Sequence, residues 1–248
     1  FEGNFIMAGV KFWPEMSRLD KDFLELASHF QQVVPIFTNV IFDTSQPHAN
    51  VIFEDMFAWL DDLLVIARRH PETLFVIRAH PDEARKGKAS EESVAEWAEA
   101  HNVTSLPNIK FIPPEEYISS YDLIRMAKFV TIYNSTIGLE AAIMGAMVLS
   151  AGRSRFSQAE TVLLPQSREE YLQQFEEFLA APVVQAPPHY CHNARRFLYY
   201  QLYYSSLPFD TYLEADGIWQ GYVRLKDFDW QQLLPENSPA LHAIAEGL

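Results

Sequence analysis

The feature that most constrains the fold is an alternation, between residues 32 and 151, of short apolar runs with longer amphipathic segments. The apolar runs are largely continuous rather than alternating, as expected of strands that helices cover on both faces. The runs span residues 33–37, 74–77, 109–112, 129–133 and 147–149, and helical patterns span residues 53–69, 90–101, 119–127 and 135–145. Strands that alternate with helices in this way predict an α/β fold, a Rossmann-like parallel sheet flanked by helices.

Three segments are expected along the chain. Residues 1–31 form an N-terminal segment, which we interpret as the remnant of a missing or truncated domain because it is too short for a domain of its own. Residues 32–155 form the Rossmann-like domain, and residues 156–248 form a mainly helical C-terminal extension. The aromatic stretch HNARRFLYYQLYYSSLPF in the extension is predicted to be helical, and we interpret its aromatic side chains as core, packed against the Rossmann-like unit or a missing domain.

The composition limits the classes of function. A formal net charge of -14 makes the average surface repel phosphate backbones, which argues against a nucleic-acid partner. The single cysteine, Cys191, cannot form an internal disulfide or a thiolate metal site and fits a reducing compartment. Apolar runs stay well below the roughly 20 residues that span a bilayer, and the first residues lack the order of a signal peptide. A cytoplasmic protein is expected.

The residues that follow each apolar run are the candidate site, because ligands bind beyond the carboxyl ends of the strands in an open parallel sheet. Arg78 and His80 follow the second run, two residues apart, and an imidazole there can donate to a phosphate or ribose oxygen. The ordinary alternative is a histidine that caps a loop before Pro81. Arg153 and Arg155 follow the fifth run, with guanidinium groups suited to diphosphate or carboxylate oxygens. Solvated surface charges are the alternative for these two.

The richest candidate follows the fourth run, in YNSTIGLEAAIMG. Asn134, Ser135 and Thr136 stand at a strand-to-helix turn, where such residues cap a helix and leave outward amides that bind an anion. Gly138 removes a side chain near that start, so that a phosphate or another backbone can approach closely. Glu140 is the only charge of this helix, one turn beyond Thr136, and can accept hydrogen bonds from two ribose hydroxyls. The alternative is an ordinary cap followed by a surface glutamate.

Weaker candidates follow the first and third runs. They are Thr38 and Asn39, and the segment 113–116, whose backbone could read a base, while Ser119 and Ser120 look like helix caps. The sequence lacks GxGxxG after the first run, GxxxxGK[ST], GxSxG and HExxH. These absences argue against dinucleotide oxidoreductases, P-loop proteins, α/β-hydrolases and zincins, and metal catalysis is not indicated.

Three stretches, in their order along the chain, resemble the C-terminal, donor-binding domain of GT-B capsular polysaccharide and lipopolysaccharide glycosyltransferases. They are IRAHPDEAR, LPNIKFIPPEEYISSYDLI and YNSTIGLEAAIMGAMVLSAG, within residues 33–155. The chain is similar in the same way to bacterial Kdo- and sialyl-transferases that carry a His-Pro motif. The resemblance implies that His80, Ser135 and Thr136 bind the donor phosphate and that Glu140 binds the ribose.

The resemblance also implies a function. We expect a glycosyltransferase domain that binds a CMP- or UDP-activated sugar during bacterial surface polysaccharide synthesis, without a cofactor, a GDP-sugar remaining open. The expected partners are the donor, a glycan or lipid-linked glycan acceptor, and either the inner face of the cytoplasmic membrane or another domain. In this family the acceptor site and the usual catalytic acid or base lie in the N-terminal domain, so no catalytic residue is assigned.

Two alternatives remain open. A sugar-nucleotide 2-epimerase would also use a diphosphate site but needs carboxylate acid and base groups in an interdomain cleft. A non-catalytic nucleotide-sugar-binding or assembly module would use the aromatic residues 199–204 as a partner surface.

Overall fold

The computed structural model describes residues 16–41, 46–84, 92–205, 207–218 and 222–247. The first half of the expected N-terminal segment and the start of the helix expected from residue 90 lie outside the described residues. The chain divides into two compact units, one of which is Met16–Phe197 and the other of which includes Leu198–Leu248. The first unit therefore extends beyond the expected boundaries at residues 32 and 155 on both sides.

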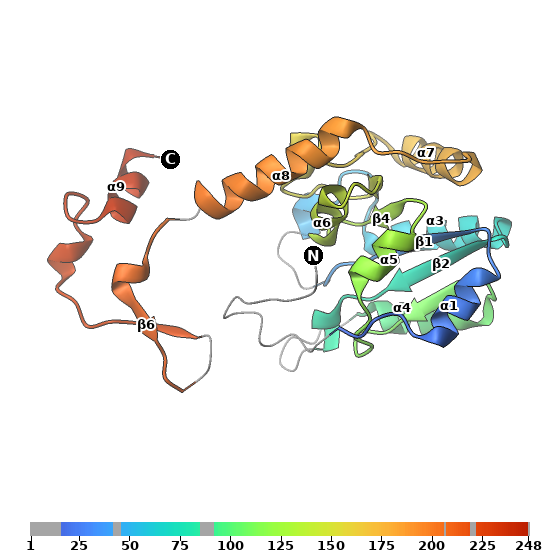
Figure 1. Ribbon diagram of the computed structural model, residues 1–248, viewed down its shortest axis with the longest axis horizontal. Coiled ribbons are helices and arrows are strands. Elements are labelled where there is room, and N and C mark those ends of the chain that lie inside the picture. The colour runs from blue at the N-terminus through green and yellow to red at the C-terminus, as the bar shows by residue number, and fades with distance from the viewer. Residues whose placement is uncertain (1–15, 42–45, 85–91, 206, 219–221, 248) are drawn as a thin grey trace. The chain divides into compact units, whose positions relative to one another are not determined.

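Five parallel strands form the sheet of the larger unit, in the order β3-β2-β1-β4-β5 (Figure 1). The strands are β1 (Gln32–Phe37), β2 (Thr73–Arg78), β3 (Ile109–Ile112), β4 (Val130–Ile132) and β5 (Val148–Ser150). Each predicted apolar run overlaps one of them, so the predicted α/β class with a Rossmann-like sheet is confirmed. Because β1 pairs with both β2 and β4, the strand order reverses between β1 and β4.

Most helices of this unit begin where a small polar side chain accepts a backbone N–H, which satisfies a donor that the first helical turn leaves open. Ser119, for example, accepts from the backbone N–H of Asp122, as its sequence context predicted. The helices are α1 (Lys21–Ser28), α2 (Gln46–Ala49), α3 (Met56–Arg69), α4 (Val94–Ala100), α5 (Ser120–Met126), α6 (Ile137–Ile143) and α7 (Arg168–Ala180). A 3-10 helix, η2 (Pro81–Ala84), follows β2.

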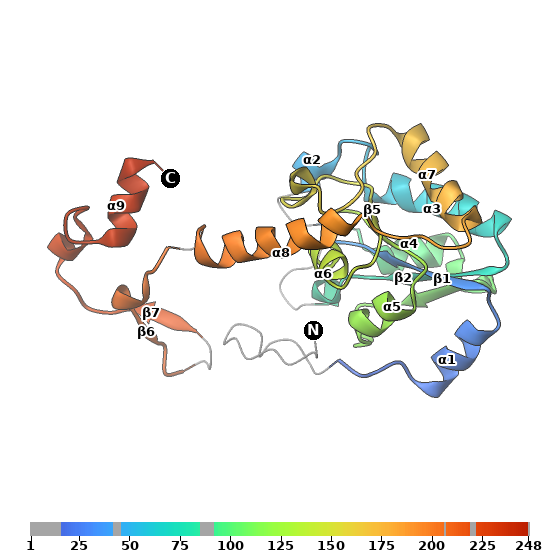
Figure 2. The ribbon, with the colours of Figure 1, turned by 45° about the horizontal axis from the view of Figure 1, so that its top comes forward.

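Helices cover both faces of the sheet (Figure 2). On one face α3, α4 and α7 pack into a core that includes Trp59, Phe75, Tyr171 and Phe175, which are fully buried. The Tyr171 hydroxyl contacts Trp59 Nε1 at 2.8 Å and Thr131 Oγ1 at 2.6 Å, so this buried phenol is fully satisfied. On the other face α5 and α6 pack against β1, β4 and β5. Helix α7 is therefore part of the sheet unit, although the sequence analysis placed it in the C-terminal extension.

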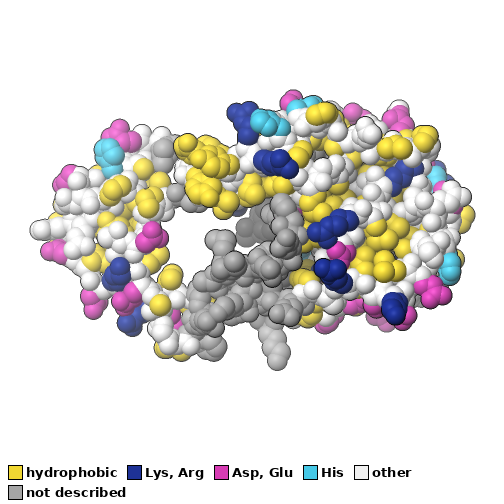
Figure 3. All heavy atoms as spheres, in the orientation of Figure 1, with side chains coloured by type: hydrophobic (Ala, Val, Ile, Leu, Met, Phe, Trp, Pro, Cys, Tyr) yellow, Lys and Arg dark blue, Asp and Glu magenta, His cyan; other side chains and the backbone are white. Residues whose placement is uncertain are grey.

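The remainder of the chain contains helices and a small sheet. Helix α8 (Pro188–Tyr203) is followed by the antiparallel strands β6 (Leu213–Ala215) and β7 (Val223–Leu225) and by α9 (Pro239–Glu246). Hydrophobic side chains gather on the surface of α8 (Figure 3). Tyr199, Tyr200, Tyr203 and Tyr204 are between 56% and 68% exposed, so these four side chains do not belong to a core of the described residues. Among the described residues, none of the helices combines the length and apolar composition needed to cross a membrane.

Candidate functional site

Two asparagines meet where the strand order reverses. Asn39 follows β1, Asn134 follows β4, and Asn39 Nδ2 donates to Asn134 Oδ1 at 2.6 Å. Both side chains are buried, and Asn39 Oδ1 also accepts from the backbone N–H of Val40 at 2.8 Å. In α/β sheets the reversal of strand order opens a crevice that binds ligands. The amide pair therefore marks the floor of the position where a ligand site is expected.

His80 lies at the same edge of the sheet, directly before η2. The backbone N–H of Asp82 donates to His80 Nδ1 at 3.2 Å, so Nδ1 acts as an acceptor. A neutral imidazole that accepts at Nδ1 carries its proton on Nε2. A ring of this tautomer can donate from Nε2 to an oxygen of an anionic ligand.

Arg78, expected beside His80 in the site, belongs to the interior instead. It is 3% exposed, and its guanidinium donates from Nε to Ser120 Oγ at 3.0 Å and from Nη1 to the Glu116 carbonyl oxygen at 3.3 Å. Burial lowers the pKa of Arg78 to about 10, and the nearby Glu116 charge partly opposes this. Arg78 thus ties the end of β2 to the segment between β3 and α5.

Thr38 is likewise interior. Its hydroxyl donates to the Arg78 carbonyl oxygen at 3.1 Å, and the side chain is 2% exposed. This bond joins the carboxyl ends of β1 and β2. In the structure Thr38 therefore links two strands, whereas the sequence suggested contact with a ligand.

The turn after β4 departs from an ordinary helix cap. Thr136 is exposed and precedes α6, but its side chain makes no capping hydrogen bond. Ser135 is buried, and its carbonyl oxygen accepts from the backbone N–H of Gly138 at 3.0 Å. The exposed Thr136 hydroxyl is therefore the group of this turn best placed to meet a ligand.

Gly138 has a packing role, which corresponds to the second of the two alternatives for this residue, close approach of another part of the backbone. A Cβ at this position would lie 2.3 Å from Ile132 Cδ1 and 3.5 Å from Phe156 Cζ. The absent side chain is thus replaced by side chains of the protein rather than by space for a phosphate. Gly138 lets α6 approach β4 closely.

Glu140 is not the surface glutamate of the ordinary alternative. Tyr121, on α5, donates its hydroxyl hydrogen to Glu140 Oε2 at 2.5 Å, and Glu140 is only partly exposed. Burial raises the pKa of Glu140, and the hydrogen bond from Tyr121 lowers it in part. The carboxylate is consequently held in place at the sheet face that carries α5 and α6.

The candidate side chains follow strands that are not all neighbours. His80 follows β2 and Thr136 follows β4, and β1 lies between these strands, so the two residues do not follow neighbouring strands. Because neighbouring strands lie about 4.8 Å apart, a ligand that contacts both residues must extend roughly 10 Å across the end of β1. Asn39 and Asn134 occupy the position between them.

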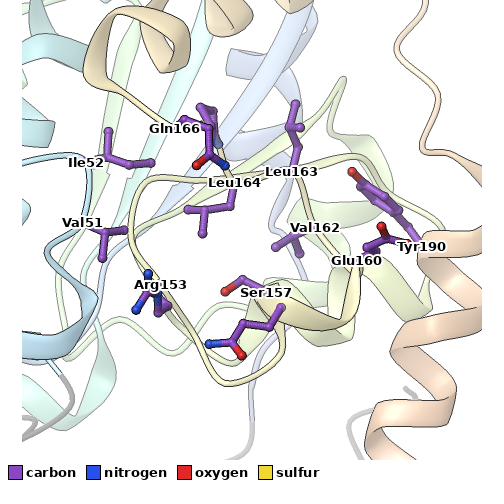
Figure 4. Close-up of a pocket in the computed structure, with 12 residues that line it drawn as sticks. Val51, Ile52, Arg153, Ser157, Glu160, Val162, Leu163, Leu164, Gln166 and Tyr190 are labelled. Atoms are coloured by element: carbon purple, nitrogen blue, oxygen red, sulfur yellow. The ribbon is translucent and has the colours of Figure 1, made fainter.

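The two arginines after β5 are exposed, and one of them lines a separate groove of about 630 Å³. Arg153 and Val51 lie at one end of this groove, and Glu160 and Tyr190 lie together at the other (Figure 4). None of His80, Ser135 and Thr136 lines it. Arg153 therefore lines a different groove from the one expected for His80, Ser135 and Thr136. Among the residues that the structure describes, no group of three or more His, Cys, Asp or Glu side chains could hold a metal ion.

Glu83, which the sequence analysis missed, lies in η2 three residues after His80. Its Oε2 accepts from the backbone N–H of Val94 at 3.3 Å, and its buried Oε1 has no hydrogen-bond partner among the described residues. Burial, with smaller contributions from the Glu115 and Glu96 charges, raises the pKa of Glu83 to about 7. This environment depends on residues that come together only in the folded chain, Val94 and Glu96 of α4 and Glu115 after β3, and no pattern in the sequence signals it.

Glu83→Gln is expected to stabilise the protein at pH 8 and to change its stability little at pH 4.5. Because the folded pKa lies above the ordinary 4.5, the folded state retains a proton that the unfolded state loses, and stability falls as pH rises towards 7. Above pH 7 the buried charge of Glu83 lowers the free energy of unfolding by about 1 to 3 kcal/mol, and the uncharged glutamine of the variant does not. Urea unfolding at both pH values measures the difference. Glu99→Gln, on the exposed face of α4, is the control, and equal stabilisation at both pH values would contradict the burial explanation.

Comparison with known proteins gives partial matches. No family model matches the sequence. Protein FixF of Sinorhizobium fredii (strain NBRC 101917 / NGR234) is 33% identical over 110 residues, which cover 44% of this chain and 24% of FixF.

Similar solved structures include the UDP-GlcNAc 2-epimerase from Neisseria meningitidis bound to UDP-GlcNAc, with 16% identity and a TM-score of 0.46 over 73% of this chain and 47% of that chain. They also include the Thermosulfurimonas dismutans KpsC beta Kdo 2,4 transferase, with 15% identity and a TM-score of 0.39 over 56% of this chain and 39% of that chain. The chain spans less than half the length of each of these proteins. The structural similarity is one of fold, at sequence identities of 16% and 15%.

Proposed function

We propose that this chain forms the nucleotide-sugar-binding half of a GT-B glycosyltransferase that acts in bacterial surface polysaccharide synthesis. The donor is a CMP- or UDP-activated sugar, and the acceptor is a glycan or lipid-linked glycan. The single observation that carries the proposal is the Asn39–Asn134 bond at the reversal of strand order, with His80, Thr136 and Glu140 following β2 and β4 on either side.

The residues divide by their chemistry. Transfer of a sugar leaves negative charge on the donor phosphate, which preorganised N–H and O–H donors stabilise. In this proposal His80 Nε2 and the Thr136 hydroxyl donate to phosphate oxygens, and Glu140 accepts from the ribose. Acceptor binding and the catalytic base are assigned to another domain, so this chain supplies donor binding and leaving-group stabilisation.

Calorimetric titration of the protein with CMP, UDP, GDP and AMP tests the proposal. One nucleotide is expected to bind more tightly than inorganic phosphate, because ribose and base contacts add to those of the phosphate. The ranking of the four also identifies the base of the donor. If none of them binds, the glycosyltransferase proposal is abandoned in favour of an assembly module without a nucleotide site.

Glu140→Gln is expected to retain the fold and to weaken binding of that nucleotide by about 1.5 to 3 kcal/mol, the range for hydrogen bonds to a charged group. Glu177→Gln, on the exposed face of α7, is the matched control and should leave the affinity unchanged. The 2′-deoxynucleotide should bind the wild type more weakly but lose little further affinity for the variant, since both changes remove the same contact. Additive losses would place Glu140 outside the ribose site.

A further inference from the structure

The Tyr121–Glu140 pair joins two helices at the candidate site. Tyr121 lies in the first turn of α5, Glu140 lies in the first turn of α6, and the two helices pack against each other. The hydrogen bond of 2.5 Å between the phenol oxygen and Glu140 Oε2 is short, as bonds to an ionised acceptor are. Both side chains are partly exposed, so the pair is partly accessible to solvent.

The hydrogen bond leaves Glu140 with unused acceptor capacity. An ionised carboxylate offers about four acceptor positions on two oxygens, and Tyr121 uses one of them, on Oε2. The Tyr121 bond also restricts rotation of the carboxylate, because a second conformation would break it. Glu140 Oε1 can therefore be presented in a fixed direction.

The bond also affects the ionisation of Glu140. Burial raises the pKa of this carboxyl group, and the hydrogen bond from Tyr121 opposes the rise. The phenol itself stays protonated, because burial and the adjacent Glu140 raise its pKa. Among the described residues, Tyr121 is the titratable side chain that contacts Glu140.

We propose that Tyr121 is a positioning residue for nucleotide binding, whose hydroxyl fixes Glu140 Oε2 and so leaves Oε1 to accept a hydrogen bond from a ribose hydroxyl. This inference rests on the proposed function of the site. Tyr121 acts through Glu140, and the inference does not require any direct contact between Tyr121 and the ligand. A purely structural link between α5 and α6 is the competing explanation, and it predicts no connection with the ribose.

The test uses Tyr121→Phe in the full chain, titrated between pH 5.5 and 8.5 with the nucleotide that binds the wild type most tightly. The variant is expected to bind about three- to tenfold more weakly, which corresponds to the loss of one hydrogen bond. The loss should be larger at the acid end, because without the phenol Glu140 takes up a proton at higher pH. Tyr199→Phe, at an exposed position, should match the wild type at every pH.

Two further measurements separate the explanations. Tyr121→Phe should have no additional effect in the Glu140→Gln background, and it should leave binding of the 2′,3′-dideoxynucleotide unchanged. The Glu140→Gln variant and the dideoxynucleotide each lack one partner of the hydrogen bond between the Glu140 carboxylate and the ribose hydroxyl. Equal loss for the nucleotide and its dideoxy form, or a loss independent of pH, would show a structural role and overturn the inference while leaving the proposed function intact. Absence of nucleotide binding by the wild type would overturn both.

Discussion

Tyr171→Ala is expected to lower the free energy of unfolding by about 3 to 5 kcal/mol, the usual cost of truncating a large buried aromatic side chain. Tyr171 is 0% exposed and satisfies both Trp59 Nε1 and Thr131 Oγ1. Its removal therefore leaves a cavity and also a buried indole N–H without an acceptor. Urea denaturation followed by circular dichroism measures the change.

Two control variants separate these contributions. Tyr171→Phe retains the ring and removes only the hydroxyl, so a loss of about 1 to 3 kcal/mol is expected. Tyr199→Ala removes a tyrosine that is 56% exposed and should change stability by less than about 0.5 kcal/mol. If Tyr171→Ala and Tyr199→Ala destabilise the protein equally, the packing of α7 on the sheet is not as described.

A protein that comprises residues 16–197 is expected to fold cooperatively, whereas one that ends at residue 155 is expected to remain unfolded. The shorter protein lacks α7, and with it Tyr171, Phe175 and Leu179, which are at most 5% exposed. Truncation of such residues costs about 2 to 5 kcal/mol each, and their sum approaches or exceeds the 5 to 15 kcal/mol that stabilises a typical domain. Thermal unfolding and the dispersion of amide proton resonances distinguish the two results. A folded protein of residues 16–155 would restore the boundary that the sequence suggested.

The sheet was predictable because its signal is local. A strand buried on both faces must be apolar at every position, and the run from Val33 to Phe37 shows this directly. Helix starts were predictable for the same reason, since Ser119 accepts from a backbone N–H only three residues away. The order of the strands depends on which runs pair, and apolar composition does not encode pairing, so β1 was not recognised as the strand between β2 and β4.

The site was predictable only as a set of positions. The edge of the sheet followed from the βα pattern, which placed His80 and Thr136 correctly after β2 and β4. The direction of a side chain at that edge depends on distant residues, as Arg78 shows: Ser120 and the Glu116 carbonyl draw its guanidinium into the interior. The Tyr121–Glu140 bond has the same origin, because it arises from the contact of two helices.

The exposure of the tyrosines in α8 could not be read from the sequence either. Aromatic residues are usually buried, and this tendency favoured a core assignment for Tyr199 and Tyr203. A burial tendency describes a residue type rather than a position, and at these positions the side chains are exposed.

The central place of β1 has a consequence for the order in which the sheet assembles. The Thr38–Arg78 bond, between the ends of β1 and β2, closes a loop of 40 residues, whereas the Asn39–Asn134 bond, between the ends of β1 and β4, closes one of 95. Doubling a loop adds about 0.6 kcal/mol of closure entropy, so we expect β1 to pair with β2 before it pairs with β4. Both halves of the crevice are then present only after the later pairing. A nucleotide that binds between the ends of β1, β2 and β4 would stabilise the pairing of β1 with β4. It would not stabilise a state in which only β1 and β2 are paired, so it would favour the completely folded chain.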